Sequence, residues 1–216
     1  AFVTTEVKGA VEVITIDRPQ ALNALNPEVL SGLKAAFEAV DLKSIRCIVL
    51  TGAGEKSFVA GADIGAMSTM TKAEGEAFSK LGNDLLLQIE SFPIPVIAAV
   101  NGFALGGGNE LAMSCDIRVC SDNAMFGQPE VGLGITPGFG GTQRLARLVG
   151  MGMAKQLVYS AFNVKADEAL RIGLVNEVLE THDQVVAHAL QTAREIASKT
   201  PLAVHGSKEM INYARD

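Results

Sequence analysis

Apolar and polar residues alternate near the start of the chain, and this alternation predicts the first element. Residues 11–16 alternate as in a half-buried strand, which ends at the Asp-Arg-Pro sequence of residues 17–19. Asn26 and Pro27 then supply an N-cap and a proline at the first helical position. We therefore expect a strand at 11–16, followed by a helix that ends at about Val40.

Three later apolar segments are predicted to be buried strands. They cover residues 45–50 and 96–100, and a third begins at Asp116. A helical pattern over residues 72–90 lies between the first two. Strands separated by helix-length segments predict right-handed crossover connections and an α/β core.

The pattern becomes helical after residue 141 and is almost entirely helical from about Thr181. Pro201 separates the last two helices, and the final one is expected over residues 202–213. Its apolar stripe includes Met210 and Ile211, so it requires a partner that could lie outside this chain. The recurring order of strand, glycine-rich turn and helix forms only a weak internal repeat.

Composition and charge narrow the functional classes. The chain has 216 residues, 48% of them hydrophobic, which suits one sizeable domain. A formal charge of -6 with acidic and basic residues interspersed argues against nucleic acid or an anionic membrane as partner. No signal-peptide pattern or membrane-length apolar run is present. We expect a soluble cytoplasmic protein, or one of the mitochondrial matrix if a transit peptide has been removed.

The cysteines predict an intracellular protein without a metal site. Cys47, Cys115 and Cys120 are odd in number and lie in apolar stretches, as reduced thiols of a core do. Neither a second cysteine pair nor a nearby histidine completes a set of metal ligands.

Residues 106–108 form a triple-glycine turn between a buried strand and a helix that carries Glu110 in its first turn. The unpaired N–H groups and the dipole of such a helix start favour an anion, or an oxygen that becomes one. Glycines that only permit close packing are an equally supported alternative, and a dinucleotide fingerprint is disfavoured because its spacing is absent. Glu110 alone could simply complement the helix dipole.

Two further segments carry candidate chemistry. Glu130 lies in a loop rich in glycine and proline, where a lone glutamate is usually solvated. Residues 52–64 form another glycine-rich loop whose N–H groups could act as donors, and Asp63 there is expected to be an N-cap. The three histidines lie in the helical C-terminal quarter, so carboxylates are the candidates for proton transfer near the turns. They are His182, His188 and His205.

Taken together, these segments resemble the crotonase superfamily and, within it, enoyl-CoA hydratase. The resemblance covers almost the whole chain, and its motifs lie at residues 18–25, 60–64, 101–110, 126–130 and 137–145. It implies an α/β fold, a crotonase-like spiral of repeated β-β-α units with a helical C-terminal region. Residues 1–180 would form the core with the acyl-CoA site. Residues 181–216 would begin a helical oligomerisation region, expected to be incomplete, through which subunits form trimers or dimers of trimers.

The resemblance also implies roles for individual residues. Glu110 would activate the water that attacks C3, and Glu130 would deliver the proton to C2. The N–H groups of Ala62 and Gly107 would form an oxyanion hole for the thioester carbonyl. No metal and no cofactor would be required, since coenzyme A is part of the substrate. Other substrate contacts would come from Ala60, Asp63, Ile64, Gly65 and Gly138, although many hydratases carry a lysine at the position of Gly65.

The pair of glutamates favours reversible hydration of trans-2-enoyl-CoA, in fatty-acid β-oxidation or in short-chain acyl-CoA metabolism. A double-bond isomerase that uses the same enolate remains an alternative. A non-catalytic relative that binds acyl-CoA or RNA is another, although the acidic balance of the chain opposes RNA binding. The acyl chain length depends on packing around residues such as Met67 and Met70, which the sequence does not define.

Overall fold

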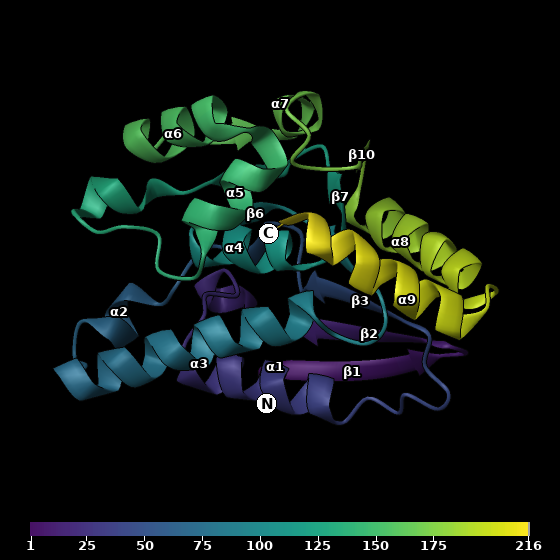
Figure 1. Ribbon diagram of the computed structural model, residues 1–216. Helices are drawn as coiled ribbons and strands as arrows, with labels where there is room; N and C mark the ends of the chain where they lie inside the picture. Colours follow the sequence, from purple (N-terminus) through teal and green to yellow (C-terminus); the bar gives the residue numbers. More distant parts are fainter. Residues whose placement is uncertain (216) are drawn as a thin grey trace.

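The computed structural model describes residues 1–215 as two β-sheets surrounded by helices (Figure 1). Within this part of the chain the larger sheet has six strands, and all neighbouring pairs are parallel except β1 with β2. In spatial order these strands are β1 (Val3–Lys8), β2 (Val11–Ile16), β3 (Cys47–Gly52), β5 (Val96–Val100), β7 (Ile117–Ser121) and β10 (Glu177–Leu179).

The smaller sheet, counted over the same residues, has four short strands. Its first three are parallel, and the last pair is antiparallel. The strands are β4 (Ser57–Val59), β6 (Phe103–Leu105), β8 (Met125–Gly127) and β9 (Val164–Lys165).

A β-β-α unit recurs along the chain. In each unit the first strand joins the large sheet, the second joins the small sheet, and a helix follows. The predicted fold class, a crotonase-like α/β spiral with a helical C-terminal region, is therefore confirmed. The units are β3-β4 with α2 (Ile64–Met67) and α3 (Lys72–Glu90), β5-β6 with α4 (Gly107–Ser114), and β7-β8 with α5 (Gly141–Val149).

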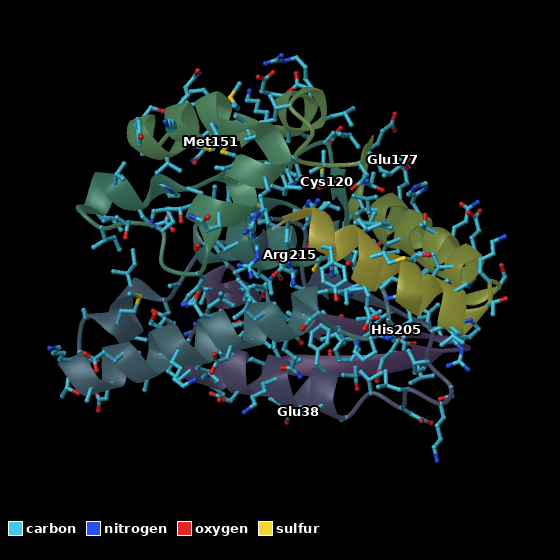
Figure 2. All side chains as sticks on the ribbon, viewed as in Figure 1. Glu38, Cys120, Met151, Glu177, His205 and Arg215 are labelled. Atoms are coloured by element: carbon cyan, nitrogen blue, oxygen red, sulfur yellow. The ribbon has the colours of Figure 1, made fainter. Side chains whose placement is uncertain are left out.

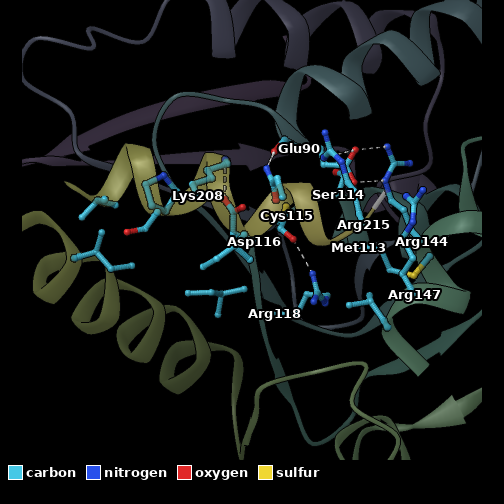
Figure 3. A pocket seen from close by; sticks show the side chains of 18 of the residues that line it. Glu90, Met113, Ser114, Cys115, Asp116, Arg118, Arg144, Arg147, Lys208 and Arg215 are labelled. Carbon is cyan, nitrogen blue, oxygen red and sulfur yellow. Dashed lines mark hydrogen bonds and ion pairs between the residues drawn. The ribbon is translucent and has the colours of Figure 1, made fainter. Parts of the chain in front are cut away.

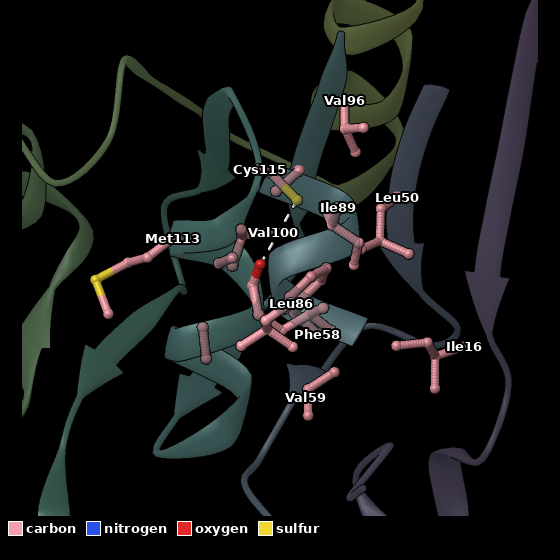
Figure 4. Packing of buried hydrophobic residues seen from close by; sticks show 14 of the residues in the cluster. Ile16, Leu50, Phe58, Val59, Leu86, Ile89, Val96, Val100, Met113 and Cys115 are labelled. Carbon is pink, nitrogen blue, oxygen red and sulfur yellow. Dashed lines mark hydrogen bonds between the residues drawn. The ribbon is translucent and has the colours of Figure 1, made fainter. Parts of the chain in front are cut away.

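Both faces of the large sheet are buried, each by its own set of helices. Along β3, Ile48 and Leu50 belong to the main core with α1 (Pro27–Glu38) and α3, whereas Val49 packs with α8 (His182–Ala197) on the other face. Alternate side chains of a strand point to opposite faces, so a strand buried on both sides is apolar throughout. Figure 4 shows part of the main core, including Leu50.

The long regular elements agree well with the sequence. The strand at 11–16, the helix at 72–90 and the strand at 96–100 are confirmed to the residue. The first helix ends at Glu38, two residues before the predicted end, and the strand predicted at 45–50 is observed at Cys47–Gly52. The strand expected to begin at Asp116 begins one residue later, and the Asp116 carboxylate accepts a hydrogen bond from the Val96 N–H.

The last helix, α9 (Pro201–Asn212), is attached to the core by ion pairs. Lys208 lies 2.9 Å from the Asp116 carboxylate and also donates to the Ile94 carbonyl. Arg215, just beyond the helix, lies 3.2 Å from the Glu90 carboxylate (Figure 3).

The domain boundary predicted at residue 180 stays a prediction. The helix α8, which follows this boundary, packs directly on the large sheet. The remaining helices are η1 (Pro19–Ala21), η2 (Pro129–Leu133), α6 (Met151–Ser160), α7 (Ala166–Arg171) and η3 (Tyr213–Arg215).

All three cysteines are free thiols in the interior, as predicted. Figure 2 shows Cys120 inside the molecule, in contrast to the exposed side chains of Glu38 and Met151. Burial raises the pKa of Cys47, Cys115 and Cys120 to about 12, so each behaves as a small apolar side chain. Within residues 1–215, no helix is both long enough and apolar enough to cross a bilayer.

One buried amide joins the ends of the two sheets. Asn101 follows β5 and is fully buried. Its oxygen accepts from the Gly52 N–H at 3.1 Å, and its amide nitrogen donates to the carbonyls of Gly52, Gly54 and Ser57. These bonds fix the turn between β3 and β4, and therefore the start of the loop that leads to residues 60–64.

Replacement of Asn101 by alanine should destabilise the protein, because the freed backbone groups would stay buried without partners. We expect a loss on the order of 3 kcal/mol in the free energy of unfolding, measured by urea denaturation. Asn123→Ala is a control, since its exposed amide donates to the Glu55 carbonyl and accepts from the Ser121 hydroxyl, which keeps the Val100 carbonyl as a partner, and it should cost about 1 kcal/mol. Equal losses in the two variants would contradict the role of Asn101.

Candidate active site

A cavity of about 720 Å³ lies between the loop before α2, the helix α3, the start of α4 and the segment from η2 to Phe139. Most of its wall is apolar, with Met67, Met70 and Phe78 on one side and Leu133 and Ile135 on the other. Glu110 and Glu130 are the acidic residues of its lining. A largely apolar cavity with a few converging polar groups is typical of a small-molecule site.

The Glu110 carboxylate is buried and is held by backbone. It projects from the first turn of α4, and its Oε2 accepts hydrogen bonds from the N–H groups of Phe139, at 2.8 Å, and Gly141, at 2.6 Å. Burial raises the pKa of Glu110 to about 7, and the charge of Glu130 adds to this shift, while the two N–H groups oppose it. A carboxyl group that titrates near neutrality can both take and give a proton.

Glu130 reaches the same end of the cavity from η2. It is half-buried, and burial raises its pKa above the ordinary value for glutamate. Both of its oxygens accept from Gln128 Nε2, at 3.1 and 3.2 Å, and this hydrogen bond opposes the rise. A Cβ atom placed on Gly106 would lie 3.3 Å from Glu130 Oε2, so this carboxylate lies beside the turn that begins α4.

Gln128 lies between the two carboxylates. A Cβ atom placed on Gly141 would lie 2.9 Å from Glu110 Oε2 and 3.0 Å from Gln128 Nε2, so both groups border the same small space. Gln128 is fully buried, and its Oε1 accepts from Asn109 Nδ2 at 2.7 Å. A row of polar groups therefore runs from Asn109 through Gln128 to Glu130.

The loop at Ala62 is oriented by a strand-like bridge to Leu25. The Leu25 N–H donates to the Gly61 carbonyl at 2.8 Å, and the Asp63 N–H donates to the Leu25 carbonyl at 2.7 Å. In extended backbone successive peptide groups point in opposite directions, so the Ala62 N–H points away from Leu25. Ala62 lines the cavity, and within residues 1–215 no protein group accepts from its N–H.

Gly107 is the first residue of α4, and its N–H has no acceptor in the part of the chain that the structure describes. Gly106 before it has a φ of 54°, which glycine adopts readily. A Cβ atom on Gly106 would lie 3.9 Å from the Gly61 Cα, so the two loops touch. The N–H groups of Ala62 and Gly107 thus belong to adjacent loops of one cavity.

The other predicted substrate contacts divide into two groups. Ala60, Ile64 and Gly138 line the cavity, as do Met67 and Met70. Asp63 and Gly65 are not part of the lining. Asp63 caps α2, as expected, by accepting from the Ala66 N–H, and its other oxygen lies 2.8 Å from Arg18. This N–H and Arg18 lower the pKa of the Asp63 carboxyl, while Gly65 lies exposed in α2.

The structure adds residues that the sequence did not single out. Gln128 and the backbone of Phe139 and Gly141 contact the glutamates directly. Gln128 precedes Glu130 by two residues, and this proximity was the available signal. The backbone donors carry no side-chain signature. The three histidines lie outside the cavity lining, and no cluster of metal ligands occurs among residues 1–215.

A second cavity, of about 590 Å³, lies beneath α9 and contains none of the predicted site residues. Its lining includes the ion pairs of Lys208 with Asp116 and of Arg215 with Glu90 (Figure 3). Arg144, whose guanidinium donates to the Phe139 carbonyl, also borders it. Glu90 also lies 3.4 Å from Arg144, so the segment after α9 is connected through Glu90 and Arg144 to the loop that holds Glu110.

Comparison with known proteins identifies the relatives of this chain. The model of the family described as enoyl-CoA hydratase/isomerase matches residues 6–216. This chain belongs to that family. The resemblance to the crotonase superfamily and to enoyl-CoA hydratase is therefore confirmed.

Individual members of the family are similar over most of their length. The chain is 59% identical over 211 residues to the short-chain-enoyl-CoA hydratase of Clostridium acetobutylicum, covering 97% of this chain and 80% of that protein. It is 55% identical over 201 residues to the crotonyl-CoA hydratase of Syntrophomonas wolfei, covering 93% and 77%. The solved enoyl-CoA hydratase of Bacillus anthracis superimposes with a TM-score of 0.95 at 37% identity, covering 98% of this chain and 83% of that one.

The raised pKa of Glu110 should make the free energy of unfolding of this chain depend on pH. Because folding favours the protonated carboxyl, Glu110 contributes stability below about pH 4.5, and this contribution is lost as the pH rises through about 7. Relative to Glu110→Gln, the unfolding free energy of the wild type should fall by on the order of 3 kcal/mol over this window, measured by urea denaturation at several pH values. Glu38→Gln, an exposed change on α1, is the control. A difference between wild type and Glu110→Gln that stays constant with pH would contradict the assignment.

Proposed function

We propose that the chain catalyses the reversible syn hydration of trans-2-enoyl-CoA thioesters to 3-hydroxyacyl-CoA, with short acyl chains as substrates. The observation that carries this proposal is the convergence of Glu110 and Glu130 at one end of an apolar cavity. The names of the relatives from Clostridium acetobutylicum and Syntrophomonas wolfei support it. β-Oxidation or short-chain acyl-CoA metabolism is the setting in which we place the reaction.

Binding of the thioester carbonyl is assigned to the N–H groups of Ala62 and Gly107. Attack at C3 moves negative charge onto this oxygen, and two amide donors from separate loops would stabilise the resulting enolate. Gly107 also lies at the start of α4, where the helix dipole favours negative charge. One such donor is typically worth on the order of 3 kcal/mol at the transition state.

The proton transfers are assigned to the two carboxyl groups, which together hold one proton. Glu110, with Oε2 held by two N–H groups, would take a proton from water through Oε1 as the water oxygen bonds to C3. Glu130 would then give its proton to C2, so that one H and one OH are added in total. Dehydration reverses both steps. The pKa of about 7 for Glu110, beside a Glu130 whose pKa is also raised, supports a proton shared by this coupled pair.

The wall of the cavity supports a short apolar acyl chain. Phe78 and Phe139 pack with their ring centroids 5.7 Å apart, and Met70 lies on the same cavity wall. With Gly65 in place of a lysine, Lys72 at the start of α3 is the basic residue of the lining that we assign to the phosphates of coenzyme A. No metal or redox cofactor takes part in the proposed reaction.

Self-association into trimers or dimers of trimers also remains a proposal. It is supported by apolar side chains that α9 exposes, since an exposed apolar stripe is a common feature of interfaces. Their exposed fractions are 79% for Leu202, 68% for Met210 and 72% for Ile211.

Replacement of either glutamate by glutamine should abolish most hydration without unfolding the protein. Each acid or base contribution is typically a factor of about 10² to 10⁴, so Glu110→Gln and Glu130→Gln should each lower kcat by that order. The measurement is the loss of the conjugated thioester absorbance of crotonyl-CoA, with circular dichroism as the test of folding. Unchanged turnover in Glu130→Gln would remove Glu130 from this role.

Isomerisation is the second candidate, because the family description names isomerases as well as hydratases. Both reactions pass through an enolate bound to the same amide donors. They differ in the product, since only hydration incorporates oxygen from solvent. Turnover in ¹⁸O-labelled water should give a labelled 3-hydroxyacyl-CoA, whereas an unlabelled shifted alkene would favour isomerisation.

A further inference from the structure

Asn109 is a buried polar side chain that the proposed reaction does not use. It precedes Glu110 in α4 and is 1% exposed. Its Nδ2 donates to Gln128 Oε1 at 2.7 Å, whereas its Oδ1 is buried without a hydrogen-bond partner among the described residues. A buried carbonyl group left unpaired costs on the order of 1–3 kcal/mol, so its retention beside the two glutamates requires an explanation.

The other end of the Asn109 side chain, Nδ2, bears on the orientation of the Gln128 amide. The two ends of this amide are similar in shape but opposite in hydrogen bonding, because Nε2 donates and Oε1 accepts. In the observed orientation the Gln128 Nε2 donates to Glu130. The Gln128 Oε1, at the other end of the amide, accepts from Asn109 Nδ2. In the reversed orientation Oε1 would face Glu130 and could accept the proton of its carboxyl group.

The reversed orientation would oppose the proposed reaction. Glu130 has to direct its proton at C2 of the substrate, and a carbonyl oxygen on its other side would compete for the same proton. A donor on that side cannot accept the proton, so it leaves the proton on the face of Glu130 that lines the cavity. The donor also stabilises the ionised carboxylate after transfer.

We propose that Asn109 is a positioning residue, which holds Gln128 with its Nε2 toward Glu130 and so prevents the Gln128 carbonyl from capturing the catalytic proton. This inference rests on the proposed function for its consequence, but the orientation itself can be tested without turnover. Asn109 is not itself part of the cavity lining, and its side chain donates to Gln128 rather than to either carboxylate.

The other charged groups near Glu130 come from three helices. Glu110 on α4 shares the proton, and Arg144 on α5 acts on Glu110 through its charge. Lys72 on α3 lines the cavity. None of these groups contacts Asn109 through a hydrogen bond, so a change at Asn109 alters Glu130 through Gln128 or directly through added charge.

The test compares Asn109→Asp and Asn109→Leu with the wild-type chain. A carboxylate at position 109 accepts only, so it should turn Gln128 Nε2 toward itself and present Oε1 to Glu130, whereas leucine leaves Gln128 unrestrained. We expect kcat for crotonyl-CoA hydration to fall about a hundredfold in Asn109→Asp, because loss of a general-acid step typically costs a factor of that order. In Asn109→Leu the step is blocked only part of the time, so kcat should fall about tenfold. KM should stay near the wild-type value in both.

The readout specific to orientation is the titration of the Glu130 carboxyl carbon by ¹³C NMR, assigned with Glu130→Gln. Loss of the Nε2 donor should raise the pKa of Glu130 in Asn109→Asp, so the carboxyl stays protonated to higher pH and the alkaline limb of the kcat profile moves upward. Ser114→Ala is the control on the same helix, because its buried hydroxyl donates only to the Leu111 carbonyl. It should change neither the titration nor the profile.

Added charge alone is separated from orientation by repeating Asn109→Asp in a Gln128→Leu background, where the shift in the Glu130 titration should become much smaller. Identical shifts in both backgrounds, or no shift in Asn109→Asp, would overturn the inference. A Glu130 shift in a protein whose wild-type form does not hydrate crotonyl-CoA would instead refute the proposed function and leave the orientation of Gln128 established.

Discussion

The contact between the buried Glu110 carboxylate and the backbone N–H groups of Phe139 and Gly141 is the interaction on which the candidate site depends. It joins the start of α4 to the loop before α5, two segments that are 29 to 31 residues apart. A buried carboxylate without such donors would be strongly disfavoured. These bonds therefore stabilise the group through Oε2, in a residue that lines the cavity.

The contact requires very close packing of backbone, which explains the glycines around it. A Cβ atom on Gly108 would lie 1.9 Å from the Val59 carbonyl oxygen, so α4 can approach β4 only with glycine at this position. A Cβ atom on Gly141 would lie 2.9 Å from Glu110 Oε2. The same close approach brings the Gly107 N–H beside the loop of Ala62. Close packing and anion binding, the two interpretations of the triple-glycine turn, are thus compatible.

Long elements with strong hydrophobic periodicity could be predicted from the sequence. Short elements that are defined only by pairing with neighbouring strands could not. The apolar stripe and caps of α3 fix its ends at Lys72 and Glu90 by local signals, among them the capping box of Thr71 and Glu74. The strands of the small sheet have two or three residues and no period of their own, so only pairing defines them. β1 was missed because five of its six residues are exposed.

In the candidate site, the sequence motifs indicated both glutamates. The backbone donors and the Asn109–Gln128 pair depend on contacts that one sequence does not reveal.

The account as a whole places two carboxylates and two amide donors around a single reacting centre. A crystal structure with a bound saturated acyl-CoA, such as butyryl-CoA, tests this arrangement most directly. The account predicts that the thioester oxygen lies about 3 Å from the N–H nitrogens of both Ala62 and Gly107, with C3 facing Glu110 and C2 facing Glu130. A thioester oxygen bound away from these amides, or either carboxylate directed away from the acyl carbons, would contradict it.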